Sequence, residues 1–172
     1  MRKSKSANEF GTHRTVRWLA VMLAAMSLVS FTSCRNDMVY SRFIPISCGG
    51  GSVVSQEKWH MDSVVRFDYS IDDAGASYSI IVYIRHNGSY PYQNMWLFAG
   101  DSLCRDTIEF YLADDRGQWL GERHHGFIEM PVLLEENKHF ADTGAYYLEI
   151  QHGMRDTLLR GVTDVGVEII RN

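Results

Sequence analysis

The sequence lacks the short motifs that identify most hydrolases and nucleotide-binding enzymes. It contains no Gly-x-Ser-x-Gly, no His-Glu-x-x-His and no glycine-rich phosphate-binding loop. It has only three cysteines, and neither Cys48 nor Cys104 has a second cysteine or a histidine close by in the sequence. Structural zinc sites are usually built from such closely spaced pairs. We therefore expect no catalytic residues, no metal site and no bound cofactor.

The sequence also lacks an apolar run long enough to cross a bilayer, which takes about 20 residues in a helix. Its most apolar run, residues 18–29, follows a basic stretch that contains Arg2, Lys3, Lys5, Arg14 and Arg17. A basic stretch, a short apolar run and small residues after it predict an export signal. Because Cys34 comes shortly after this run, with Ser33 before it, we predict a lipoprotein signal that is cut before this cysteine, whose sulfur then carries a covalent lipid. Ordinary secretion with a free Cys34 is the alternative.

Basic residues become scarce once this signal is removed. Of the 17 Lys and Arg, 5 lie in residues 1–33, against 1 of the 21 Asp and Glu, so residues 34–172 carry 12 against 20, a net charge of −8. Nucleic acid and anionic lipid surfaces bind mainly to basic protein surfaces. The acidic balance therefore argues against nucleic acid as a partner and against charge-driven membrane adhesion. We therefore expect the protein to associate with the membrane through its lipid alone.

Residues 34–172 show no sustained 3.6-residue period, which argues against long amphipathic helices. Val65, Phe67, Tyr69 and Ile71 alternate with polar residues, which is typical of a half-buried strand. Further strands are predicted at 78–86, 93–99, 106–112, 145–151 and 162–170, with a single helical turn at 153–160. Short strands at this spacing predict an all-β fold, an antiparallel β-sandwich of jelly-roll or immunoglobulin-like type.

The predicted organisation has three parts. Residues 1–33 are the signal peptide, residues 34–60 form a lipidated tether, and residues 61–172 form the β-sandwich domain. Pro45 and the Gly49–Gly51 run are the loop-forming residues that indicate a tether.

Aromatic residues exceed what one face of a small core needs. We predict Tyr90, Tyr92, Trp96 and Trp119 as interface residues, since surplus aromatic side chains anchor protein partners or stack on sugars. A wide aromatic core is the alternative.

Three further groups of residues have two interpretations each. Cys48 and Cys104 either form a disulfide in an oxidising compartment or stay unpaired, with Cys104 buried as a small hydrophobic residue. The adjacent His124 and His125 are expected in a solvated turn rather than around a metal. Paired carboxylates such as Asp114-Asp115 are expected at solvated turns rather than in an acid/base pair.

Three ordered stretches carry a family resemblance. Residues 84–94 (IRHNGSYPYQN) are close to the pattern LRN-x-x-x-YPY-x-N, and residues 105–121 (RDTIEFYLADDRGQWLG) are close to a DT-(L/I)-E strand followed by LAD and WLG. Residues 144–166 contain IQHGMR and LRGVTDVG. Together they resemble the gliding-motility lipoprotein family GldH over roughly residues 38–170. This chain departs from the family at residues 122–125, where members are often richer in glycine.

The resemblance implies an envelope lipoprotein in the machinery of gliding motility and type IX protein secretion. We expect the lipid to hold it on the outer membrane, facing the periplasm, because the residues just after Cys34 include only Asp37 as an acid. Its partners would be other envelope motility or secretion proteins, and it implies no catalytic residues. Two other functions stay open on the residues alone. The aromatic surplus also suits a carbohydrate-binding envelope lipoprotein, and a hydrolase with a dispersed site is the third hypothesis.

Overall fold

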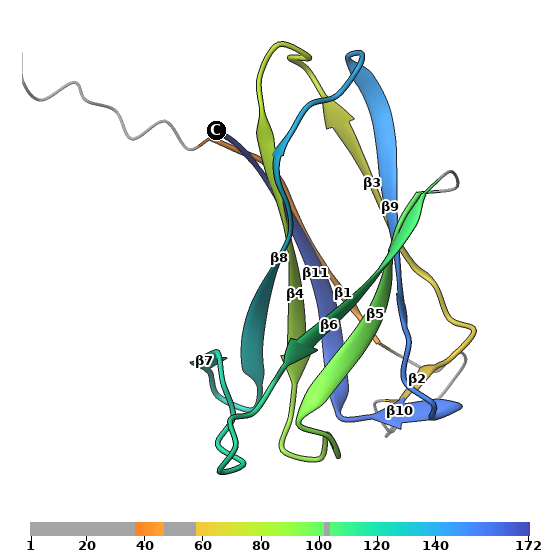
Figure 1. The fold of residues 1–172 in the computed structure, drawn as a ribbon, viewed down its shortest axis with the longest axis vertical. Helices are drawn as coiled ribbons and strands as arrows, with labels where there is room; N and C mark the ends of the chain where they lie inside the picture. Colours follow the sequence, from red (N-terminus) through yellow and green to blue (C-terminus); the bar gives the residue numbers. More distant parts are fainter. Residues whose placement is uncertain (1–36, 47–57, 102–103) are drawn as a thin grey trace, which may run out of the picture. The chain divides into compact units, whose positions relative to one another are not determined.

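A computed structural model describes residues 37–46, 58–101 and 104–172, and these residues form eleven β-strands (Figure 1). Two antiparallel sheets are packed face to face, and a short two-stranded sheet lies at one end. The five-stranded sheet has the order β1 (Met38–Pro45), β11 (Val162–Arg171), β4 (Tyr78–His86), β8 (Ile128–Lys138) and β7 (Glu122–Arg123). The four-stranded sheet has the order β3 (Val65–Ile71), β9 (Gly144–His152), β5 (Asn94–Gly100) and β6 (Arg105–Tyr111). The two-stranded sheet pairs β2 (Lys58–His60) with β10 (Leu158–Arg160).

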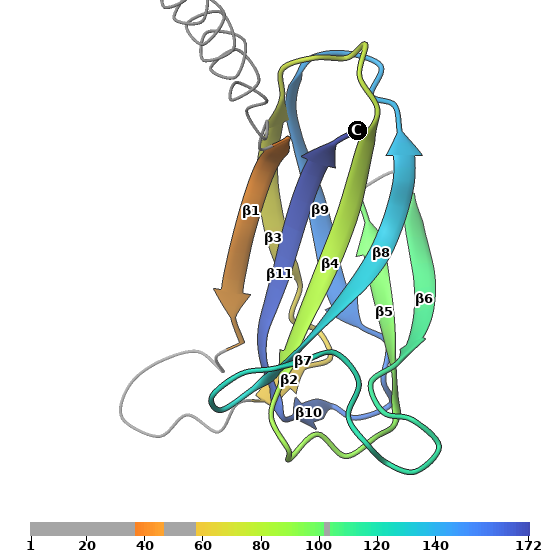
Figure 2. The same cartoon turned by 90° about the vertical axis from the view of Figure 1, so that its left-hand side faces the viewer.

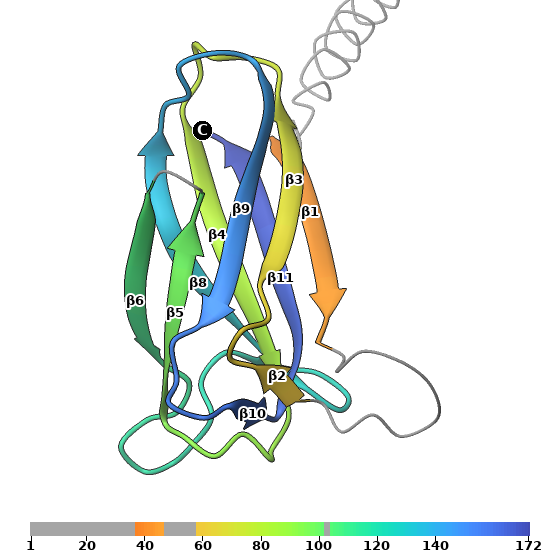
Figure 3. The same ribbon diagram turned by 90° about the vertical axis from the view of Figure 1, so that its right-hand side faces the viewer.

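The expected all-β antiparallel sandwich is confirmed. Figure 2 shows the five-stranded sheet from its outer side, and Figure 3 shows the four-stranded sheet from the opposite direction. Strand β4 is central to the first sheet and alternates strictly between buried and half-buried residues. Strand β3 alternates between buried and exposed residues, as its sequence pattern predicts.

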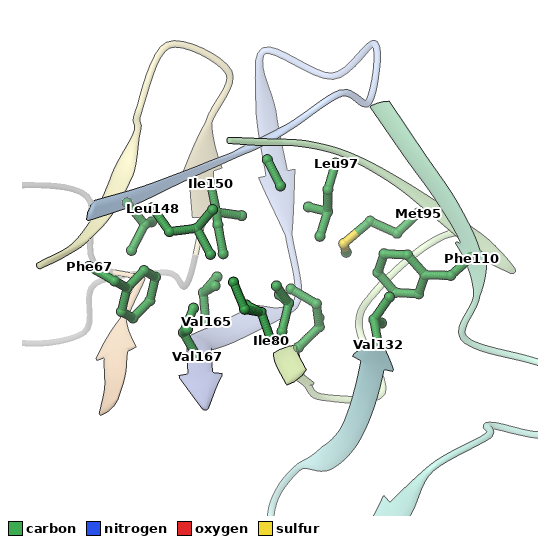
Figure 4. Close-up of a cluster of buried hydrophobic side chains, with 14 of the residues drawn as sticks. Phe67, Ile80, Met95, Leu97, Phe110, Val132, Leu148, Ile150, Val165 and Val167 are labelled. Atoms are coloured by element: carbon green, nitrogen blue, oxygen red, sulfur yellow. The ribbon is translucent and has the colours of Figure 1, made fainter. Parts of the chain in front are cut away.

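The core lies between the inner faces of the two sheets (Figure 4). Phe67, Leu97 and Ile150 point inward from the four-stranded sheet and are fully buried. Ile80 and Val167 meet them from the five-stranded sheet and are equally buried. Burying an aliphatic or aromatic side chain of this size contributes about 1.5–3 kcal/mol to folding. This shared core therefore holds the two sheets together.

The β2–β10 sheet covers one end of this core. Trp59 of β2 and Leu159 of β10 are directly opposite each other and are almost completely buried. The Trp59 indole N–H donates a hydrogen bond of 2.9 Å to the Ser63 carbonyl, which satisfies its only polar atom.

Three segments differ from the sequence interpretation. The predicted tether of residues 34–60 contains β1, which pairs with β11 from Met38 to Pro45, so the sandwich begins near residue 38. Within the predicted helical turn of 153–160, residues 158–160 form β10. Strand β8 was not predicted, because Pro131 interrupts the run and charged residues follow it. Proline is accepted here because β7 covers only the first two residues of β8 and leaves Pro131 at an open edge.

Candidate partner-binding surface

The three motif stretches meet at the end of the sandwich that the β2–β10 sheet covers (Figure 3). The Asn87 N–H, at the end of β4, donates to the Gly161 carbonyl at 2.8 Å. The Leu112 N–H, after β6, donates to the Gln93 carbonyl at 2.7 Å. Backbone hydrogen bonds therefore connect stretches that are far apart in the sequence, and together they fix the shape of this end.

Two of the four predicted interface residues belong to the interior of this end. Tyr90 is 3% exposed, and its hydroxyl donates to the Asn94 carbonyl at 2.8 Å. Trp119 is half-buried, with its ring 4.7 Å from that of His86 in an edge-to-face arrangement. Tyr90 is therefore not a surface residue, because its ring fills the space between the loops and its hydroxyl is already hydrogen-bonded.

Gly161 allows two backbone segments to approach very closely in this region. Its φ is +87°, in the left-handed region. A Cβ at this position would lie 2.3 Å from the Tyr90 nitrogen and 2.6 Å from the Tyr90 Cα. Only glycine permits the loop before β5 to pack this closely on the turn before β11.

Two histidines are buried at the same end, at the last residues of β4 and β9. His86 Nδ1 lies 3.3 Å from the Asn87 carbonyl, and His152 Nε2 lies 3.1 Å from the Trp59 carbonyl. Burial lowers the pKa of both histidines, because the charged imidazolium would lose its hydration. His86 Nε2 and His152 Nδ1 have no hydrogen-bond partner among the described residues. Both rings are accordingly neutral members of the core at pH 7.

The other two predicted interface residues are exposed, and they lie in a larger group that we call the aromatic strip: Tyr92, Trp96, Phe98 and Tyr111. Their exposed fractions are 38%, 37%, 37% and 56%. Strand β5 turns Met95, Leu97 and Ala99 into the core, so Trp96 and Phe98 point outward. Tyr111 is opposite Asn94 in the pairing of β5 with β6, which puts it on the same outer face.

A groove of about 440 Å³ lies beside this strip. It is lined by Tyr92, Asn94, Trp96, Gly153, Met154 and Arg155. The Tyr92 hydroxyl donates a 2.6 Å hydrogen bond to Asp156, and this bond to a carboxylate raises the pKa of Tyr92. The groove therefore combines aromatic walls with a fixed phenol and a guanidinium group, a composition suited to binding rather than to proton transfer.

The paired carboxylates and the paired histidines make contacts that stabilise local structure. Asp114 Oδ1 accepts hydrogen bonds from the Arg116 and Gln118 amides at 2.9 and 2.8 Å, which organises the turn after β6. The ring of His124 stacks on Phe127 at 4.9 Å. Within residues 37–46, 58–101 and 104–172, no group of three or more His, Cys, Asp or Glu is arranged to hold a metal ion.

The cysteines are only partly described. Cys34, the predicted lipidation site, and Cys48 lie outside the described residues, so a disulfide between Cys48 and Cys104 stays a prediction. Cys104 is exposed rather than buried, and its N–H donates to Asp101 Oδ1 at 2.9 Å in the turn between β5 and β6. In the part of the chain that the structure describes, no helix is long and apolar enough to cross a membrane.

The sequence interpretation missed Phe98, Tyr111 and Met154. Phe98 follows Trp96 by two residues, so the period of a strand alone would have put both rings on one face. Tyr111 becomes a neighbour only through the β5–β6 register. Met154 Sδ lies 3.3 Å from the Trp96 nitrogen, a contact between residues 58 positions apart that no local pattern indicates.

Comparison with known proteins gives a consistent result. The profile of the family described as GldH lipoprotein matches residues 52–169. The "Gliding motility lipoprotein GldH" of Flavobacterium johnsoniae is 30% identical over 161 residues, covering 87% of this chain and 92% of that protein. The "Gliding motility lipoprotein GldH homolog" of Christiangramia forsetii is 29% identical over 162 residues, covering 87% of this chain and 94% of that protein.

Proposed function

Because this chain belongs to the GldH lipoprotein family, we propose that it is a lipid-anchored component of the gliding motility and type IX secretion machinery. Its role is to assemble or stabilise that machinery through protein contacts, without catalysing a reaction. It is held on the outer membrane by lipid on Cys34 and faces the periplasm.

The aromatic strip is the observation that carries this proposal. Trp96 and Phe98 project from the outer face of β5, away from the core that holds the sandwich together. Aromatic side chains at protein interfaces contribute large contact areas at a small loss of conformational freedom. The strip adjoins a groove that contains Arg155, and arginine and aromatic residues are the types most enriched among energetically dominant interface contacts.

A pull-down from native membranes tests the proposal. The lipidated protein is compared with a Trp96→Ala variant, and captured proteins are identified by mass spectrometry. Leu133→Ala is the matched control, since Leu133 is 54% exposed on the outer face of the other sheet. We expect envelope motility or secretion proteins to be enriched by the unaltered chain and by Leu133→Ala, and to be lost with Trp96→Ala. Equal capture by all three, or no such proteins in any sample, would refute the proposal.

A carbohydrate-binding role is the second candidate, and the groove beside the strip supports it. Exposed indole and phenol rings next to hydrogen-bonding groups such as Asn94 and Arg155 also suit a sugar ring. On a glycan array, this role requires binding that Tyr92→Ala or Trp96→Ala abolishes. An array without binding would exclude it in favour of protein partners.

A further inference from the structure

We propose that the end of the sandwich at which β1 begins rests against the lipid headgroups. The opposite end, which carries the groove beside the aromatic strip and which we call the groove end, is then held away from the bilayer. This orientation rests on the proposed lipid anchor at Cys34. The partner of the β1 end is thus the surface of the membrane itself.

The short length of chain between the lipid anchor and the domain is the first evidence for this orientation. The Asp37 carbonyl accepts a 2.7 Å hydrogen bond from the Arg171 N–H, so Asp37 is fixed to the last strand of the sandwich. Three residue steps separate Cys34 from Asp37, and three residues can span at most about 11 Å. A lipidated Cys34 therefore cannot lie far from this end of the domain.

The same end is built by loops from both sheets. The Asn172 N–H donates to the Ser77 carbonyl at 2.9 Å, and its side-chain amide donates to Asn137 Oδ1 at 3.1 Å. The turn between β3 and β4 and the last residues of β8, which lead into the loop before β9, thus lie beside the C-terminus (Figure 1). All of them would face the membrane together with Asp37.

The charge of this end determines what kind of contact it can make. Asp72, Asp73, Glu136 and Asp142 are exposed there. Arg171 forms a salt bridge with Asp72. Such a surface gains nothing from anionic lipid and cannot enter the hydrocarbon layer, so it suits the hydrated headgroup layer. The lipid supplies the attachment, and the loops limit how far the domain tilts.

The opposite end exposes large apolar and aromatic side chains besides its charged ones. Met61, Tyr92, Leu120 and Leu158 are large apolar or aromatic residues with 37–45% of their surface exposed. Strand β4 has nine residues and connects the two ends. At about 3.4 Å per residue, it spans about 30 Å. A short anchor therefore presents the groove end to proteins beyond the membrane surface, not to the bilayer.

Fluorescence quenching by lipids with a quencher on the headgroup tests this orientation. Single labelling sites are made by Thr143→Cys in the β8–β9 loop and by Gly88→Cys at the far end, with Cys48 and Cys104 changed to serine. Thr143 is exposed, and a side chain at Gly88 would meet nothing within 4 Å. The full lipidated protein is placed in phosphatidylcholine vesicles. A third variant carries a flexible Gly-Ser insertion of about ten residues after Asn36, long enough to let the domain tumble.

We expect several-fold stronger quenching at position 143 than at position 88, and near-equal quenching at both positions with the insertion. Equal quenching without the insertion, or stronger quenching at position 88, would overturn the orientation. A difference that survives the insertion would overturn the argument from chain length. Mass spectrometry of the intact protein checks the lipid separately, because absence of lipid on Cys34 overturns the anchor as well, whereas lipid with equal quenching overturns the orientation alone.

Discussion

Replacing Gly161 by alanine should destabilise the domain by about 2–5 kcal/mol. The backbone at this position has φ +87°, and a left-handed conformation costs a residue with a Cβ about 1–2 kcal/mol. The new methyl group would also lie 2.3 Å from the Tyr90 nitrogen, so the backbone of one loop must move. Forcing extra atoms into a packed site typically costs about 1–3 kcal/mol more.

Gly117→Ala is the matched control for this prediction. Gly117 has a similar φ of +75°, but a Cβ there would meet nothing within 4 Å. Gly117→Ala should therefore lower the free energy of unfolding only by the cost of the left-handed conformation, about 1–2 kcal/mol. Urea denaturation of both variants, with unchanged m values, gives the two free energies of unfolding. If Gly161→Ala were no more destabilising than Gly117→Ala, the close contact with Tyr90 would not exist and the packing of the groove end would have to be revised.

The remaining predictions concern pH and the outer face of the five-stranded sheet. Burial lowers the pKa of His86 and His152 below the ordinary 6.5, so in acid the unfolded chain binds more protons than the folded one. The free energy of unfolding should therefore be at its full value above about pH 6.5. Below that pH it should fall by up to about 1.4 kcal/mol per pH unit for each histidine. Urea midpoints at pH 7 and pH 5 measure this, and equal midpoints would contradict it. Gly166→Ala should destabilise the domain less than Gly161→Ala does, because the atoms nearest to the new methyl group belong to the side chain of Phe43 rather than to backbone, and the backbone at Gly166 is not in the left-handed region. Calorimetry of the two variants ranks them, and the opposite order would refute the reasoning.

Local sequence patterns predicted the elements whose two faces differ most. Strand β3 alternates buried and exposed residues, and it contains all four residues whose alternation predicted it, from Val65 to Ile71. Asn87 and Gly88, a pair typical of turns, do form one here, in which Asn87 Oδ1 accepts a 2.9 Å hydrogen bond from the Ser89 N–H. That turn does not join two neighbouring strands, however, because β4 and β5 belong to different sheets.

Elements whose order depends on distant partners could not be predicted in this way. Strand β1 contains Ser41, Arg42 and Pro45 and is ordered by its pairing with β11, more than 110 residues later. Tyr90 and Tyr92 are two residues apart in one loop, yet one is buried and the other exposed. The difference arises from Gly161 and Asp156, which approach from the last third of the chain. Local composition indicated aromatic residues of interest but not which of them face solvent.

Site-specific photo-crosslinking in living cells tests the central claim most directly. A photoreactive phenylalanine analogue is placed at Trp96, in the aromatic strip, and separately at Leu133, which is exposed on the outer face of the other sheet. Position 96 should give a discrete crosslink to an envelope motility or secretion protein, and position 133 should not give the same product. No crosslink from position 96, or the same product from both positions, would contradict the proposed role of the aromatic strip as a partner-binding surface.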